Sequence, residues 1–356
     1  MKKLLLLLFI CSGYQTIAQT VIKNDDPHIH YMGRTYQKDG ATILSWPGTS
    51  VSINFNGTGV NVTLGDENGQ NYYNVIIDGN ADRSFRTKIG KNNYTLAEGL
   101  PAGNHTLQLF KRTEWVMGRS WFFNFELTGG GKILPAPETK KRKIEFYGNS
   151  ITCGYAVEDL SGQDRGTSPY ENNYLSYAAI TARNYNAEYS CIARSGIGLM
   201  ISHYHQIMPE MFHLTDGADP DSEWDFSKFT PDVVVINLFQ NDAGLVMRPD
   251  LPEYKVRFGD TPPTPEKIIS AYQDFVKQLR AKYPQATIIG VLGSMDAVRE
   301  GLPWAGYIKK AVAGLNDKKV FAYIFKYKNT PGHPNVAQQQ DMANELIKFI
   351  DQKVKW

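Results

Sequence analysis

The stretch that decides the fold is IEFYGNSITCGY, residues 144–155, in which a short apolar run ends at a glycine. The run has the length and character of a β-strand that is covered on both faces. Gly148 permits a tight exit from this strand. Ser150 then stands beyond the strand end, where its hydroxyl is expected to be exposed and its N–H to point into a site. A serine that merely caps a helix or turn would give the same local pattern.

Downstream of this stretch, strand and helix patterns alternate to the end of the chain. Strands are expected at residues 144–148, 187–193, 231–238, 286–293 and 320–325. Helices are expected at residues 174–185, 198–208, 265–283 and 335–354. This alternation predicts a domain over residues 144–356, a three-layer α/β fold with a mostly parallel sheet.

Upstream, residues 19–130 have a different pattern. Apolar and polar residues alternate at period two, and turns such as Asn56-Gly57 and Asp78-Gly79 separate the runs. Several short strands at this spacing predict a β-sandwich of the jelly-roll kind. Glycines, prolines and charges over residues 131–143 predict an extended, solvated linker between the two domains.

The first 18 residues have the pattern of an export signal. Lys2 and Lys3 precede an apolar run that is too short to span a bilayer permanently, and small residues lead to a cleavage point after Ala18. We therefore expect a periplasmic or secreted protein; a lipoprotein anchored through Cys11 is the alternative. Two cysteines in expected core segments, Cys153 and Cys191, are predicted to be free thiols.

Composition argues against several classes of partner. The formal net charge is only +2, which gives no electrostatic case for binding nucleic acid. The histidines at positions 28, 30, 203, 205 and 213 match no zinc spacing, so neither a metal nor another cofactor is expected.

Chemistry-bearing residues stand where a parallel sheet builds its site, beyond the carboxyl ends of strands. Gly196 follows the second strand, and its N–H can serve as an oxyanion donor. Asn241 follows the third strand and offers a neutral side-chain N–H donor. His333, between two prolines and before the last helix, would act as the base that takes the proton of Ser150.

Each of these segments alone has a simpler reading. Loops between strands and helices are often glycine-rich, an Asn-Asp pair forms turns, and a histidine can cap a helix. In chain order, however, the four segments supply a nucleophile, its oxyanion donors and a base. Together they predict a serine esterase.

At this point the chain resembles the SGNH, or GDSL-like, hydrolases, and most closely carbohydrate esterase family 2, which joins an N-terminal jelly roll to an SGNH domain. The resemblance covers nearly all of residues 19–356. Its motifs are FYGNSITCGY at 146–155, ENNY at 171–174, SGIG at 195–198 and GHPN at 332–335. The resemblance implies removal of acetyl groups from plant polysaccharides such as xylan and glucomannan. It implies Ser150 as nucleophile, Gly196 and Asn241 as oxyanion donors beside the N–H of Ser150, and His333 as base.

The chain departs from the family pattern at three positions. Asn149 replaces the usual aspartate before the nucleophile, and Phe239 replaces a glycine near Asn241. Thr330 stands three residues before the histidine, where an aspartate is common. We therefore expect a Ser–His dyad, in which the proline-stiffened loop holds His333. Three acids could substitute from elsewhere: Asp242, Asp296 and Asp317.

Two tryptophans in loop-rich parts of the second domain, Trp224 and Trp304, are candidates for stacking on a sugar ring, although core packing accounts for them equally well. The leading hypothesis is an acetyl-ester hydrolase that acts on a polysaccharide or oligosaccharide. A carbohydrate-binding protein that has lost catalysis on the same scaffold is the alternative, motivated by the three departures. A third reading keeps the chemistry on a lipid or another acyl ester, and the sequence has no long apolar lid in its favour.

Overall fold

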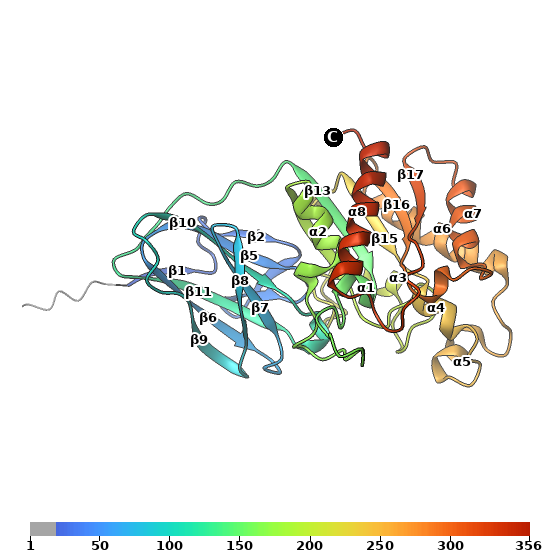
Figure 1. Cartoon of the computed structure of the whole chain (residues 1–356), viewed down its shortest axis with the longest axis horizontal. Coiled ribbons are helices and arrows are strands. Elements are labelled where there is room, and N and C mark those ends of the chain that lie inside the picture. Colours follow the sequence, from blue (N-terminus) through green and yellow to red (C-terminus); the bar gives the residue numbers. More distant parts are fainter. Residues whose placement is uncertain (1–18) are drawn as a thin grey trace, which may run out of the picture.

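A computed structural model describes residues 19–356, so the expected export signal lies outside the described residues. A region built of β-strands lies at one end of the molecule and a layered α/β region at the other (Figure 1). This is the predicted architecture, and the fold class is confirmed.

The N-terminal region is a sandwich of two antiparallel sheets of six strands each. In one sheet the order is β3-β4-β11-β6-β9 with β1 on β11, and in the other it is β12-β5-β10-β7-β8 with β2 on β5. The strand bounds are β1 Thr20–Lys23, β2 His30–Met32, β3 Thr35–Lys38, β4 Ala41–Leu44, β5 Ser50–Asn56, β6 Gly59–Asp66, β7 Tyr72–Ile77, β8 Asn80–Arg86, β9 Gly90–Ala97, β10 Asn104–Lys111, β11 Ser120–Thr128 and β12 Lys132–Ile133. Alternate residues of these strands form one apolar core, as in β5, where Val51, Ile53 and Phe55 are fully buried.

The start of the expected linker belongs to the sandwich. Strand β12 pairs with β5, with Ile133 opposite Phe55, and only the residues after it run free of a sheet to β13. The glycines at 129 and 130, both with positive φ, turn the chain back from β11 so that this pairing forms.

The C-terminal region carries a five-stranded parallel sheet in the order β14-β13-β15-β16-β17. The strands are β13 Arg142–Gly148, β14 Ala187–Ala193, β15 Val233–Asn237, β16 Thr287–Leu292 and β17 Val320–Ile324. The helices are α1 Ser150–Cys153, α2 Tyr177–Asn184, α3 Met208–Met211, α4 Gln240–Leu245, α5 Pro252–Phe258, α6 Pro265–Lys282, α7 Trp304–Gly314 and α8 Val336–Lys353. Short 3-10 turns are η1 Trp115–Met117, η2 Asn173–Leu175, η3 Phe226–Lys228 and η4 Asp296–Val298.

Alternation along the central strands divides the core into two layers. Side chains such as Val234 and Ile236 pack with α6 and α7, whereas Val233 and Val235 pack with α2 and α8 on the opposite face. Cys153 and Cys191 lie in the second layer as buried free thiols, as predicted.

One predicted helix is absent. Residues 198–208 form loops and bends, and only α3 begins at the end of this range. The backbone N–H groups of Leu199, Met200 and Ile201 donate to the Asp242 carboxylate and not to carbonyls within a helix. A side chain distant in sequence thus replaces the helical hydrogen bonds.

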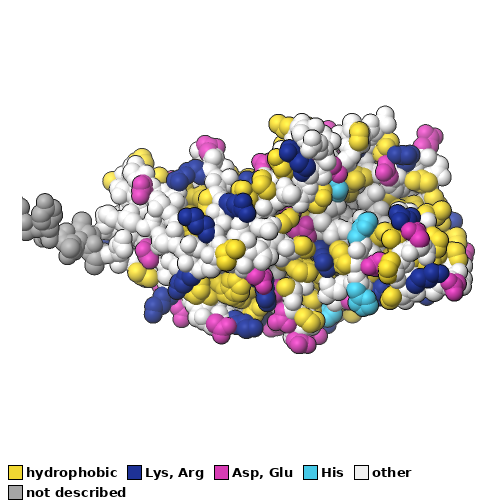
Figure 2. All heavy atoms as spheres, turned by 90° about the horizontal axis from the view of Figure 1, so that it is seen from below, with side chains coloured by type: hydrophobic (Ala, Val, Ile, Leu, Met, Phe, Trp, Pro, Cys, Tyr) yellow, Lys and Arg dark blue, Asp and Glu magenta, His cyan; other side chains and the backbone are white. Residues whose placement is uncertain are grey.

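On the face shown in Figure 2, charges of both signs are interspersed, and several histidines lie over the α/β region. No helix within residues 19–356 combines the length and apolar character needed to cross a membrane.

Buried polar contacts join the two regions. Arg34 of the sandwich is fully buried, and its guanidinium donates to Glu145 at 3.1 Å, to the Tyr147 hydroxyl at 3.0 Å, and to the carbonyls of Phe212 and Leu214. Removing one partner of such a pair would leave a charge in a dry environment, which is strongly unfavourable. Separating the two regions would therefore break a buried ion pair.

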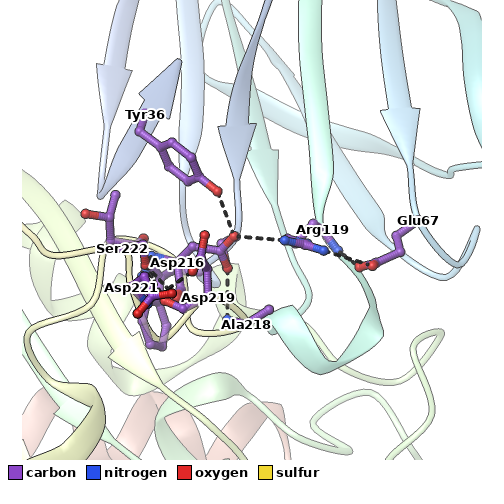
Figure 3. A network of polar contacts seen from close by, with 11 residues as sticks. Tyr36, Glu67, Arg119, Asp216, Ala218, Asp219, Asp221 and Ser222 are labelled. Carbon is purple, nitrogen blue, oxygen red and sulfur yellow. Dashed lines mark hydrogen bonds and ion pairs between the residues drawn. The ribbon is translucent and has the colours of Figure 1, made fainter. Parts of the chain in front are cut away.

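A second contact centres on the buried Asp216 (Figure 3). It accepts hydrogen bonds from Tyr36 at 3.0 Å and Ser45 at 2.7 Å, both from the sandwich. Arg119, which also pairs with Glu67, lies 3.7 Å from the same carboxylate. Sandwich side chains thereby hold the loop that follows Leu214.

Candidate active site

The sequence around Ser150 fixes a tight turn from β13 into α1. A Cβ on Gly148 would lie 2.0 Å from Thr152 Oγ1, so only glycine fits there. The Asn149 side chain accepts the N–H of Ile151 at 3.1 Å and caps α1. Asparagine thus does the capping that an aspartate would do. Ser150 is the first helical residue, and it keeps a small opening to solvent with 5% exposure.

His333 lies beside this serine. Its Nε2 is 2.8 Å from Ser150 Oγ, although the two residues are 183 positions apart. The histidine belongs to the loop between β17 and α8, and Asn335 ends this loop by capping α8. The structure therefore brings together the nucleophile and the base that the sequence predicts.

An acid completes the arrangement, and here the expectation of a dyad is wrong. Asp164 Oδ2 lies 2.9 Å from His333 Nδ1, and Asp164 Oδ1 accepts the backbone N–H of His333 at 2.8 Å. Burial opposes ionisation of this carboxyl, but the hydrogen bonds from His333 prevail and lower its pKa. The three acids suggested from the sequence are engaged elsewhere: Asp242 with the backbone of residues 199–201, Asp296 with Arg299, and Asp317 with Arg280.

Asp164 comes from the loop after α1, and this loop closes on itself. Arg165 donates to both oxygens of Asp159, from Nη2 at 2.7 Å and from Nε at 3.1 Å, and its guanidinium lies over the Tyr170 ring. Gly332 makes room on the other side, since a Cβ there would approach Asp164 Cγ to 3.0 Å at a φ of +69°. The polar sequence SGQDRGTS at 161–168 predicts a loop, but it gives no indication that Asp164 pairs with His333.

The predicted oxyanion donors follow the ends of β14 and β15, the two strands that flank β13 in the sheet. Gly196 has a φ of +81°, a conformation that favours glycine. Asn241 Nδ2 donates one hydrogen to the Ile197 carbonyl at 2.7 Å, which leaves its second hydrogen available. Within the described residues, the N–H groups of Ser150 and Gly196 donate to no protein acceptor. Three N–H donors are thus left without a protein acceptor just beyond the carboxyl ends of the adjacent strands β13, β14 and β15.

Asp242 holds the backbone of residues 199–201, which follow Gly196. Its carboxylate is buried and accepts N–H groups from Leu199 at 2.9 Å, Met200 at 2.6 Å and Ile201 at 3.2 Å. Burial raises its pKa to about 6, against the lowering effect of these hydrogen bonds. The Asp242 carboxyl group therefore holds the segment that follows Gly196 and whose Ile197 carbonyl accepts the Asn241 amide.

The two tryptophans expected to stack on sugar are buried. Trp304 is 5% exposed and packs against Phe239 at a centroid distance of 5.3 Å. Trp224 is 8% exposed and lies 5.2 Å from the Arg34 guanidinium. Neither offers an open ring face, so the structure contradicts this prediction in favour of core packing. Phe239, which lies two residues before Asn241, is itself part of this buried core and has a φ of +79°.

Two family models match the chain. Residues 31–137 match carbohydrate esterase 2 N-terminal, and residues 146–341 match the GDSL-like Lipase/Acylhydrolase family. The chain is 36% identical over 350 residues to the cellulase/esterase CelE of Acetivibrio thermocellus, covering 93% of this chain and 40% of that protein. It is 27% identical over 360 residues to an acetylxylan esterase / glucomannan deacetylase of Cellvibrio japonicus, covering 98% of this chain and 96% of the relative.

Solved structures agree. A family two carbohydrate esterase from Clostridium thermocellum in complex with cellohexaose superposes with a TM-score of 0.82 at 35% identity, over 91% of this chain and 98% of that chain. A family two carbohydrate esterase from Cellvibrio japonicus gives 0.83 at 26% identity, over 94% and 98%.

The parallel sheet, with a serine directly after its first strand and a histidine before its last helix, defines a GDSL-like hydrolase. Within that class, the chain belongs to carbohydrate esterase family 2 and is a carboxylic ester hydrolase.

Proposed function

We propose that this chain removes O-acetyl groups from plant cell-wall polysaccharides or their oligosaccharides, such as xylan and glucomannan. The names of the Cellvibrio japonicus relatives, which join acetylxylan esterase and glucomannan deacetylase activities, support this substrate class. The observation that carries the proposal is the continuous hydrogen-bonded series from Ser150 through His333 to Asp164.

In the proposed first step, His333 Nε2 takes the proton of Ser150 Oγ while that oxygen attacks the acetyl carbonyl. The carbonyl oxygen becomes an oxyanion, which accepts hydrogen bonds from the N–H groups of Ser150 and Gly196 and from Asn241 Nδ2. The C–O bond to the sugar then breaks. His333 returns its proton to the departing sugar oxygen, and an acetyl group remains on Ser150.

In the second step, His333 takes a proton from water, and the resulting hydroxide equivalent attacks the acetyl-serine. Collapse of the second oxyanion releases acetate and returns the proton to Ser150 Oγ. Asp164 acts throughout on the far nitrogen of the histidine. An ionised carboxylate there keeps the proton on Nδ1, leaves Nε2 free as the base, and stabilises the imidazolium.

We further propose that the protein is exported, with residues 1–18 as a cleaved signal, because a polymeric cell-wall substrate lies outside the cell. An acetylated polysaccharide or oligosaccharide is the proposed partner. The chemistry requires neither a metal nor an organic cofactor.

The test is acetate release from acetylated xylan, acetylated glucomannan and a small aryl acetate. Ser150→Ala should lower kcat on all three by a factor on the order of 10⁶, because no other group replaces the nucleophile. Ser270→Ala, which changes an exposed serine on α6, is the matched control and should leave the rates unchanged. Wild-type activity in the Ser150 variant would refute the assignment. Binding of these glycans by the wild type without acetate release would favour the carbohydrate-binding alternative.

A further inference from the structure

One segment of the sandwich reaches the oxyanion side of the proposed site. Glu114 lies between β10 and η1, and it is 1% exposed. Its Oε2 accepts the backbone N–H of Ser195 at 2.8 Å, across 81 positions of sequence. Ser195 immediately precedes Gly196, the proposed oxyanion donor.

The backbone around Gly196 is held at successive points. The N–H of Arg194 donates to the Gly148 carbonyl at 3.3 Å, and the N–H of Ser195 donates to Glu114. The carbonyl of Gly196 accepts the N–H of His203 at 3.0 Å. These anchors fix the peptide planes on both sides of the Gly196 N–H, which is itself left for a ligand. The anchor on Ser195 is the one that comes from the other domain.

The sandwich segment that carries Glu114 also contacts Arg194. The Arg194 guanidinium lies 4.5 Å from the Trp115 ring centroid and 3.3 Å from the Tyr204 ring centroid. Its Nη1 also donates to Gln206 at 3.1 Å. Trp115 directly follows Glu114, so two consecutive sandwich residues engage the two residues before Gly196.

Glu114 is in turn held rigidly. Its own N–H donates to the carboxyl group of Glu171, and Lys111 Nζ donates to the Thr113 carbonyl at 2.6 Å. Burial raises the pKa of both Glu114 and Glu171. A glutamine at position 114 resembles the native side chain in shape and keeps a side-chain oxygen that can accept the Ser195 N–H.

We infer that Glu114 is a positioning residue for the oxyanion hole, so that the sandwich completes the esterase site through the Glu114–Ser195 hydrogen bond. This inference rests on the proposed function, since Gly196 must donate to the substrate oxyanion. It assigns to the N-terminal domain a part in catalysis that does not require that domain to touch the sugar.

The test compares Glu114→Ala and Glu114→Gln on 4-nitrophenyl acetate. Glu114→Ala should lower kcat by about 10²-fold with little change in KM, since a misplaced oxyanion donor affects the transition state and not ground-state binding. Glu114→Gln should stay within about threefold of the wild type, because its amide oxygen still accepts the Ser195 N–H.

A second measurement separates positioning from damage to the fold. A 4-nitrophenyl alkylphosphonate places its P=O group where the oxyanion forms, and Ser150 Oγ displaces 4-nitrophenolate once per site. Glu114→Ala should slow this single turnover as much as it lowers kcat, measured at a temperature at which circular dichroism shows both proteins to be fully folded. Tyr36→Phe is the control, because it removes a cross-domain hydrogen bond to Asp216 that touches neither Ser195 nor Gly196.

Equal phosphonylation rates in Glu114→Ala and the wild type would overturn the inference. If Glu114→Ala does not fold, Glu114→Gln supplies the test. A Glu114→Gln variant that folds but loses 10²-fold in both assays would also overturn the inference, because it keeps the hydrogen-bond acceptor and still loses activity. Phosphonylation that persists in Ser150→Ala would instead show that the proposed nucleophile is wrong.

Discussion

The two sides of Ser150 are supported by carboxyl groups in opposite environments. On the base side, the Asp164 side chain is 32% exposed and comes from a surface loop closed by Asp159 and Arg165. On the proposed oxyanion side, Asp242 and Glu114 are buried and accept backbone N–H groups. The acids differ accordingly in pKa, which is lowered in Asp164 and raised in the buried pair.

The difference follows from what each side must hold. In the proposed mechanism, the Asp164 side must stabilise a positive imidazolium on His333, which calls for a carboxylate that stays ionised. The proposed oxyanion side must hold backbone peptides in place, and a carboxyl oxygen can accept their N–H groups in either protonation state. The charge of Asp164 thus lies near solvent, where its desolvation costs little, and buried carboxyl groups hold the backbone in place.

Removing the charge on the base side should give the largest effect. Asp164→Asn should lower kcat by a factor on the order of 10⁴, because the new amide can donate to Nδ1 and favour the tautomer with its proton on Nε2, facing Ser150. Steady-state kinetics on an aryl acetate measure this loss. Asp26→Asn is the matched control, since Asp26 makes a similar 2.8 Å contact with His28 on the sandwich surface. A loss below tenfold would mean that the loop alone orients His333.

Neutralising the buried acid should act on stability and not primarily on rate. Asp242 has a pKa of about 6 in the folded protein against an ordinary value of 3.8. The folded state therefore binds this proton more tightly, and the group's contribution to the wild-type unfolding free energy falls as pH rises from 4 to 7. Relative to Asp242→Asn, the wild type should lose at most about 3 kcal/mol over this range. Urea unfolding at each pH tests this, and parallel pH profiles would contradict it.

Loosening the loop of Asp164 should give the smallest effect. Arg165→Ala removes the pair with Asp159, and because Arg165 is well exposed we expect less than about a fivefold fall in kcat. Arg248→Ala breaks an exposed bidentate pair with Asp250 and serves as control. A fall as large as that of Asp164→Asn would show that the ion pair, and not the carboxylate position alone, sustains the base side.

The same comparison explains what could be predicted from the sequence. Ser150, Gly196, Asn241 and His333 each follow a strand or precede a helix, so topology alone brings them to one edge of the sheet. Asp164 lies in an irregular loop, and no periodicity relates it to a histidine 169 positions away.

The errors have physical causes of the same kind. Residues 198–208 have a helical pattern, but Asp242 competes for their N–H groups. Trp224 and Trp304 lie in stretches whose sequence predicts loops, yet the tertiary fold covers both rings. A sequence pattern reflects residues that are close along the chain. Each incorrect prediction concerns a residue whose environment is set by residues distant in sequence.

The buried Arg34–Glu145 pair has a consequence for how this chain can be rearranged. A β-sandwich that precedes an α/β region along the chain looks like a separate module that could be exchanged. Here the cation is on one module and its counter-ion is on the other, with both side chains fully buried. Moving either domain alone into another protein would leave Arg34 or Glu145 without its counter-ion. Recombination or protein engineering can therefore move only the two domains together.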